Sequence, residues 1–252
     1  MIKPVVIALG ALMLPSSTIA LAEPVVFEAS GASPADLQSS VDDFRFFLGP
    51  LNPNVANSFP NGRREINWDA VPDAFASPHP MPANFFNANS PRGAVFFTPG
   101  TGFEISADSD NPTNTPVRFG NLNPVFPQIF STFSPQRLFT ALGSNITEML
   151  FFVPGSPTGA TVEGFGSVFT DVSRADSTKI EYFDVHGALL FSRNVLPGTT
   201  NRGSLSFLGV GFDAGERVYM VRITSGNRVA KTPARDVVVM DDFIYGEPQG
   251  TE

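Results

Sequence analysis

The pattern of apolar and polar positions predicts a β protein, and its clearest segment is residues 236–245 near the C-terminus. Successive side chains of a strand point to opposite faces, and both faces of this segment are apolar. The pattern therefore predicts a central strand that is covered on both sides. It also places Asp241 and Asp242 on opposite faces. A buried carboxylate needs a hydrogen-bonding, cationic or metal partner, so at least one of these acids should have one.

Shorter runs of the same kind, separated by Gly and Pro turns, predict the other strands. We expect strands at 24–29, 93–98, 103–107, 137–141, 148–153, 160–171, 179–184, 188–194, 204–212 and 217–224. Gly187 suits a hairpin turn between two of these segments. Strands at this spacing predict an all-β fold, specifically a jelly-roll-like β-sandwich.

One segment has helical periodicity instead. Apolar residues recur at positions 37, 41, 44 and 48, which is the spacing of one helix face. Ser33 is a capping residue type, and Pro34 fits the first helical position, where its missing N–H is harmless. Gly49 and Pro50 end the pattern. We predict a single N-terminal helix at about 34–48.

The chain after residue 22 has a suitable length for one large sandwich. We expect a single domain at 23–252, with a loop-rich N-terminal part at 23–136 and regularly spaced strands at 137–252. The composition includes 25 Phe, 23 Pro and 22 Gly. Such a composition is typical of a folded β protein with many turns, because a disordered chain has few large apolar residues.

The first 22 residues have the features of a secretory signal peptide. Lys3 precedes a short apolar run at 4–14, and Ala20-Leu21-Ala22 is a small-x-small cleavage site. No later stretch has the length of a membrane span, so we expect a secreted or periplasmic protein. The chain has no cysteine and a formal charge of −8. These values argue against disulfides and thiolate metal sites and against nucleic acid as a partner.

Several segments together resemble a known group of proteins. They are Gly-Phe-Gly-Ser-Val-Phe-Thr-Asp-Val (164–172), Ile-Glu-Tyr-Phe-Asp-Val-His-Gly (180–187), Leu-Ser-Phe-Leu-Gly-Val (205–210), Val-Met-Asp-Asp-Phe (239–243) and the run at 62–69. The chain resembles uncharacterised secreted bacterial β-sandwich proteins, some of which carry a PEP-CTERM sorting tail. The resemblance covers most of the chain after residue 22 and implies fold and export, but no particular activity. The apolar and basic segments of such a tail do not precede Glu252, so we do not expect anchoring by that route.

The first candidate site is a structural calcium site. Hard cations prefer carboxylate and carbonyl oxygens, and a sandwich could bring Glu28 of its first strand to Asp241 and Asp242 of its last. The alternative is an ion pair in which Arg222 neutralises one aspartate, so that loss of either partner leaves a buried charge. The sequence leaves both options open.

The second candidate is a ligand site in a dense cluster of polar residues with the only Trp of the chain. Its residues are Arg63, Arg64, Glu65, Asn67, Trp68 and Asp69. In the functional interpretation, the Trp face stacks on a sugar ring while the planar polar groups bind its hydroxyls. In the structural interpretation, which we favour, Trp68 belongs to the core and Arg64, Glu65 and Asp69 form a network that holds a long loop.

Catalytic signals are weak. A Ser–His–Asp arrangement needs a histidine base, and both His79 and His186 are expected in solvated loops. Carboxylate pairs suited to a glycosidase exist, such as Glu65 with Asp69, but ion pairing explains them equally well. We therefore expect a non-catalytic secreted sandwich that binds a glycan or another extracellular surface component. The alternatives are a polysaccharide-acting hydrolase or lyase and a structural matrix protein.

Overall fold

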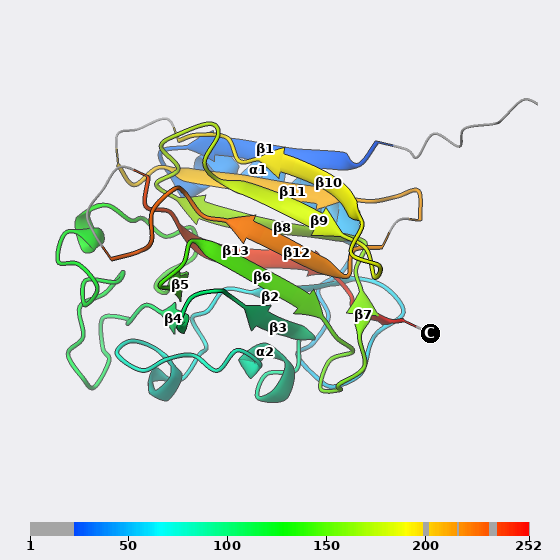
Figure 1. Ribbon diagram of the computed structural model, residues 1–252, viewed down its shortest axis with the longest axis horizontal. Helices are drawn as coiled ribbons and strands as arrows, with labels where there is room; N and C mark the ends of the chain where they lie inside the picture. Colours follow the sequence, from blue (N-terminus) through cyan, green and yellow to red (C-terminus); the bar gives the residue numbers. More distant parts are fainter. Residues whose placement is uncertain (1–22, 199–201, 216, 232–235, 252) are drawn as a thin grey trace, which may run out of the picture.

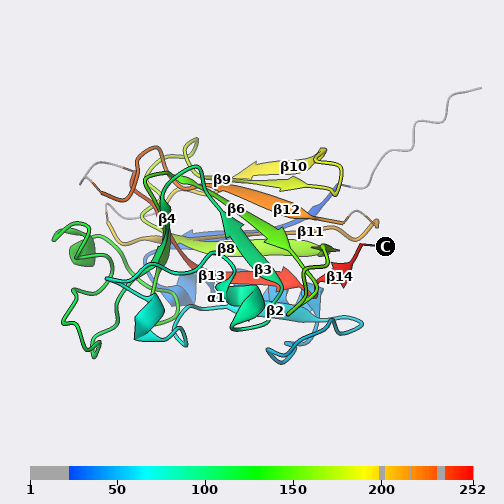
Figure 2. The ribbon, with the colours of Figure 1, turned by 60° about the horizontal axis from the view of Figure 1, so that its bottom comes forward.

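The computed structural model describes residues 23–198, 202–215, 217–231 and 236–251. It confirms an all-β sandwich with an N-terminal helix. Two antiparallel sheets face each other, and helix α1 (Pro34–Leu48) lies on the outer face of the larger one (Figures 1 and 2). The predicted signal peptide lies outside the described residues. None of the described helices is long and apolar enough to cross a bilayer.

In the described part of the chain, the larger sheet has the strand order β1-β11-β8-β13-β5-β4, with β2 attached to β13, and the smaller sheet has the order β10-β9-β12-β6-β3. The larger sheet consists of β1 (Val25–Gly31), β2 (Arg63–Ile66), β4 (Gly102–Ile105), β5 (Phe139–Leu142), β8 (Gly164–Thr170), β11 (Leu205–Gly211) and β13 (Val239–Gly246). The smaller sheet consists of β3 (Ala94–Phe97), β6 (Ile146–Phe151), β9 (Lys179–Phe183), β10 (Leu189–Asn194) and β12 (Met220–Thr224). A separate short pair joins β7 (Ala160–Thr161) to β14 (Gln249–Gly250).

The strand predictions are confirmed in position, with three exceptions. The segment predicted at 160–171 is divided into β7 and β8. The polar cluster at 63–66, placed in a loop-rich region by its prolines, forms β2, and β14 was also not predicted. Residues 23–136 supply β1, β2, β3 and β4 to the two sheets. The N-terminal part of the chain therefore contributes strands to both sheets of the sandwich.

The space between the sheets is filled largely by phenylalanine rings. Phe139 packs against Phe96 and Phe243, with ring centroids 5.2 Å and 5.8 Å apart, and Phe243 packs edge-on against Phe165 at 5.3 Å. Figure 2 shows the resulting layers: the smaller sheet, the larger sheet and α1. Burial of so many rings supplies the apolar area that a chain without cysteine needs for stability.

Helix α1 begins and ends where the sequence predicts. The backbone N–H of Ser33 donates to the Asp36 carboxylate at 2.9 Å, which forms a capping box. Gly49 ends the helix with a φ of +90°, a backbone conformation that favours glycine. The helix buries one face, consisting of Leu37, Val41, Phe44 and Leu48.

This face packs on side chains of the larger sheet, including Phe207 and Ile244, and on a patch of four glycines among them, which we call the glycine patch. Gly209 of β11 pairs with Gly166 of β8, and Gly211 pairs with Gly164. A Cβ atom on Gly209 would lie 2.8 Å from the Phe44 ring, closer than real carbon atoms approach. The glycines therefore let the helix rest its aromatic rings directly on the backbone of two strands.

Strand β13 lies inside the larger sheet and is entirely buried, as predicted for a central strand. The prediction that Asp241 and Asp242 lie on opposite faces is wrong, because the strand contains a β-bulge. Met240 pairs with Phe169, but Phe243 pairs with Ser167, so β13 has one more residue than its partner over this interval. The bulge turns both aspartates toward the outer face, where α1 lies.

Candidate functional site

The bulge coincides with a change of neighbour along β13. On one side β13 pairs with β8, whereas on the other it pairs with β5 at Met240 and with β2 from Phe243 onward. The two aspartates therefore lie at the gap between β5 and β2, where neither strand pairs with β13. The segments that connect to these strands, 67–69 and 133–137, meet over this break in the sheet.

Asp241 and Asp242 share a small hydrogen-bond network. The backbone N–H of Phe133 donates to Asp241 Oδ2 at 2.6 Å, and the Ser134 hydroxyl donates to Asp242 Oδ1 at 2.6 Å. The two carboxyl groups are also hydrogen-bonded to each other. The cation nearest to Asp242 is Arg45 of α1, whose Nη2 lies 4.0 Å from Oδ2.

Burial changes the acidity of both groups. It raises the pKa of Asp241 well above its ordinary value, and the neighbouring Asp242 charge raises it further. Burial also raises the pKa of Asp242 to about 6, although the Ser134 hydroxyl opposes the change. The desolvation of a charged group drives both shifts. Both shifts favour the protonated forms, so the pair retains a proton at pH values where an exposed aspartate is ionised.

Trp68 covers the gap between β5 and β2 on the side that faces the core between the sheets. Only 1% of the residue is exposed, its ring stacks on Phe139 at 4.2 Å, and its indole N–H donates to the backbone oxygen of Asp241 at 2.9 Å. That oxygen belongs to the bulge, where ladder bonds are interrupted. The structure therefore supports the core interpretation of Trp68, because no open ring face is left for a sugar.

Arg64 is also structural. It is fully buried, and its guanidinium makes a two-point ion pair with Glu247 at 2.6 Å and 2.8 Å. The same group donates to four backbone oxygens, which belong to Pro53, Val55, Asn57 and Pro91. This arginine holds the long loop after α1 in place, and its guanidinium is occupied by these protein groups.

The other polar residues of the cluster occupy different positions. Glu65 accepts two hydrogen bonds from Arg45, at 3.0 Å and 2.8 Å, and one from Arg63 at 2.6 Å. Asp69 accepts the backbone N–H groups of Gln136 and Arg137 at 2.6 Å and 3.0 Å. Glu65 thereby joins β2 to α1, and Asp69 fixes the segment that enters β5.

These elements enclose a polar cavity of about 500 Å³, which we call the central groove. Its lining residues are Gln38, Arg45, Leu51, Asn52, Asn54, Glu65, Asn67, Arg92, Phe133, Ser134, Pro135 and Asp242. The groove thus brings together members of both candidate sites that the sequence singled out, since Glu65 and Asn67 come from the polar cluster and Asp242 from the proposed calcium site. Arg63, Arg64, Trp68 and Asp69 do not line it but support its wall.

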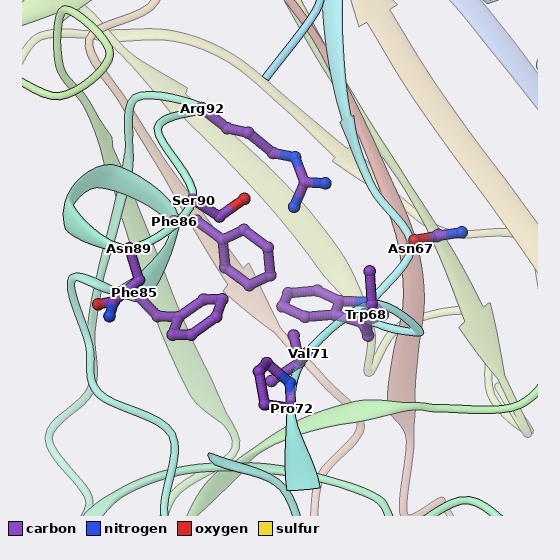
Figure 3. Close-up of a pocket in the computed structure, with 10 residues that line it drawn as sticks. Asn67, Trp68, Val71, Pro72, Phe85, Phe86, Asn89, Ser90 and Arg92 are labelled. Atoms are coloured by element: carbon purple, nitrogen blue, oxygen red, sulfur yellow. The ribbon is translucent and has the colours of Figure 1, made fainter. Parts of the chain in front are cut away.

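A smaller cavity of about 230 Å³, the side pocket, adjoins the groove and shares Asn67 and Arg92 with it. Its walls combine apolar residues, including Val71, Phe85 and Phe86, with the polar residues Asn89 and Ser90. Figure 3 shows the Arg92 side chain extending from its loop into the space above the Phe86 and Trp68 rings. The guanidinium lies 5.1 Å from the centre of the Phe86 ring.

The structure does not bring Glu28 to the aspartate pair. Strands β11 and β8 separate β1 from β13, a distance of about 14 Å at the usual spacing of strands. Glu28 instead makes an ion pair with Arg193 of β10 at 2.7 Å. Over the described ranges, no group of three or more acidic or histidine side chains is arranged to hold a metal ion.

The proposed role of Arg222 is also wrong. It lies on β12 in the other sheet and pairs with Glu148 at 2.7 Å. The cation near the aspartate pair is Arg45 and not Arg222, because the bulge turns both acids toward helix α1. Both His79 and His186 are exposed, as expected.

The sequence interpretation missed nine of the twelve lining residues, among them Arg45, Arg92 and Ser134. Arg45 had a signal, since it occupies the last turn of a predicted helix with Asp42 one turn earlier. Arg92 and Ser134 lie in proline-rich loops, where no periodicity indicates which way a side chain points.

Neither a protein-family model nor a curated protein matches the chain.

Proposed function

We propose that this protein is a secreted, non-catalytic sandwich that binds a glycan of an extracellular surface in the central groove. The observation that supports this is the lining of the groove. Guanidinium, carboxamide and carboxylate groups of Arg45, Asn52, Glu65 and Asn67 surround one cavity. Such planar groups form paired hydrogen bonds with neighbouring hydroxyls, which is what a sugar ring presents.

The polar groups are held in place before any ligand arrives. Two arginines fix Glu65, and the Asn52 amide donates to Glu247 Oε2 at 2.8 Å. Leu51 and Phe133 add apolar surface at the rim. Because these groups are ordered by the fold, binding costs little side-chain entropy. Asn67 is exposed and lines both cavities, so it is the residue best placed to meet a ligand directly.

The test is binding to a broad panel of neutral and acidic oligosaccharides, followed by calorimetry on those that bind. We expect Asn67→Ala to weaken binding at least fivefold without changing the melting temperature. The matched control is Asn194→Ala, an exposed asparagine on β10 that lies outside the groove. The proposal fails if the wild type binds no oligosaccharide, a result that would favour a structural matrix protein, or if Asn67→Ala binds normally.

A polysaccharide-acting enzyme is the second candidate, and one observation favours it. Asp242, whose pKa is raised to about 6, faces the same groove as Glu65, and an acid with a raised pKa beside a second carboxylate is the usual glycosidase arrangement. Reducing-sugar release from mixed polysaccharides, abolished in Asp242→Asn, would establish this activity. The absence of release by a wild type that binds the same polysaccharides would exclude it.

Calcium binding by Asp241 and Asp242 stays a prediction, now without Glu28 as a ligand. Calcium needs ionised carboxylates, and the raised pKa of Asp242 means that the ion must displace a proton from the pair. Calcium should therefore raise the melting temperature more at pH 8 than at pH 5.5, and EDTA should reverse the change. Equal melting temperatures with calcium and with EDTA at pH 8 would end the calcium hypothesis.

A further inference from the structure

Arg92 differs from the other arginines around the groove in its partners. Arg45 and Arg63 both contact the Glu65 carboxylate, and Arg64 contacts Glu247. In the described part of the chain, no ion pair includes Arg92, and its buried Nε–H has no hydrogen-bond acceptor. A guanidinium that is partly removed from water without an anionic partner is costly.

The surroundings of Arg92 increase this cost. Burial lowers the pKa of Arg92, and the nearby positive charge of Arg64 acts in the same direction. One face of its guanidinium is covered by the Phe86 ring, a contact that orients the group. The backbone of Arg92 is fixed as well, because its carbonyl accepts the Tyr245 hydroxyl at 2.9 Å. The cation is therefore held in one position at the junction of the two cavities.

We infer that Arg92 forms the anion subsite of the central groove and that the bound glycan carries a carboxylate, as a uronic acid does. This inference rests on the proposed function and specifies its ligand class. A planar guanidinium binds a carboxylate with two parallel hydrogen bonds. The sugar hydroxyls then face Asn67 and the other groove residues, which line the same cavity as Arg92.

A uronate fits this junction better than other carboxylates do. The side pocket places the apolar rings of Phe85 and Phe86 near Arg92, and the groove adds hydrogen-bonding groups. A uronic acid presents both an apolar ring face and a set of hydroxyls next to its charge. A small carboxylate such as acetate would satisfy Arg92 but leave the polar lining of the groove without partners.

The test compares a galacturonate trisaccharide with its carboxyl-reduced form, the corresponding galactose trisaccharide, by calorimetry on the full chain. We expect the wild type to bind the acidic form at least tenfold more tightly. Arg92→Gln should lose this preference, and Arg92→Lys should retain part of it because the charge remains without the planar geometry. Arg174→Gln, an exposed arginine in a loop away from the groove, is the matched control.

Each outcome has a defined meaning. Equal affinity of the wild type for the acidic and reduced forms, or an unchanged preference in Arg92→Gln, overturns the uronate inference and leaves glycan binding intact. Absence of binding by either form overturns the uronate inference, and the oligosaccharide panel then decides whether glycan binding itself stands. Competition by acetate at the same concentration as the acidic trisaccharide overturns the inference, because the site would then recognise any carboxylate. Melting curves confirm that each variant is folded.

Discussion

At the scale of single residues, the aspartates of the bulge determine how stability responds to pH. The folded protein holds their protons more tightly than the unfolded chain does, because burial penalises the charged forms. Their favourable contribution is complete below the unfolded pKa near 3.8 and is lost as pH rises through about 6 for Asp242 and higher for Asp241. The protein should therefore become less stable between pH 4 and pH 8.

Asp241→Asn tests this directly. The amide replaces a protonated carboxyl of the same shape, since its oxygen can accept from Phe133 and its N–H₂ can donate to Asp242. We expect the variant to be more stable than the wild type at pH 8 by on the order of 1–3 kcal/mol and to have a flatter pH profile. Urea unfolding from pH 4 to pH 8 measures both quantities.

The control for this experiment is Asp171→Asn. Burial also raises the pKa of Asp171 to about 6, but this residue lies at the end of β8 outside the bulge network. Its substitution should remove a separate part of the pH dependence and leave the contribution of the bulge. If the wild type and Asp241→Asn give parallel profiles, the pair does not retain this proton.

Trp68 gives a second prediction at this scale. Its φ of +67° is unusual for a large side chain, and stacking on Phe139 together with the hydrogen bond to Asp241 holds it there. We expect Trp68→Ala to cost about 3–5 kcal/mol of unfolding free energy, measured by urea titration. A variant that keeps wild-type stability but loses glycan binding would instead support the stacking-platform interpretation.

Several residues of the candidate site could be predicted from the sequence, but the faces toward which their side chains point could not. The sequence drew attention to Glu65, Asn67 and Asp242, and all three line the groove. Alternation along an ideal strand then placed the two aspartates on opposite faces, because a bulge inserts a residue without a signature of its own. The burial of Arg64 was likewise invisible, since its partner Glu247 lies far along the chain.

At the scale of elements, the contact between α1 and the glycine patch can be tested. We expect Gly209→Ala to cost about 1–3 kcal/mol, because the new methyl group would push the Phe44 ring and with it the helix away from the sheet. The matched control on the same strand is Ser206→Ala. The Ser206 hydroxyl is buried without a partner, so its removal should be nearly neutral. Equal effects of the two substitutions would mean that the helix does not depend on the patch.

Most elements were predictable because their local signals agree with the fold. The helix has a cap, an apolar stripe and a terminal glycine, and the structure uses all three. Strand β2 was missed because two of its four residues are arginines and a third is a glutamate. Such a strand is possible because Arg64 is neutralised by Glu247, and the sequence of the strand alone does not show that partner.

At the scale of the whole molecule, Arg64 and Glu247 connect distant parts of the chain. We expect Arg64→Ala to cost about 3–5 kcal/mol, because Glu247 would remain as an unpaired buried charge. The double variant Arg64→Met with Glu247→Gln should recover part of this loss. Thermal or urea unfolding measures each variant. A double variant no more stable than Arg64→Ala would show that the arginine acts mainly through the four backbone oxygens that it binds.

The position of β13 in the chain has a consequence for the order of folding. This strand lies inside the larger sheet, yet it follows every other described strand of that sheet along the chain, and β1, the first of them, pairs only with β11. Pairing over such separations is slow. The larger sheet therefore stays divided, with β8 on one side and β5 and β2 on the other, until β13 inserts between them.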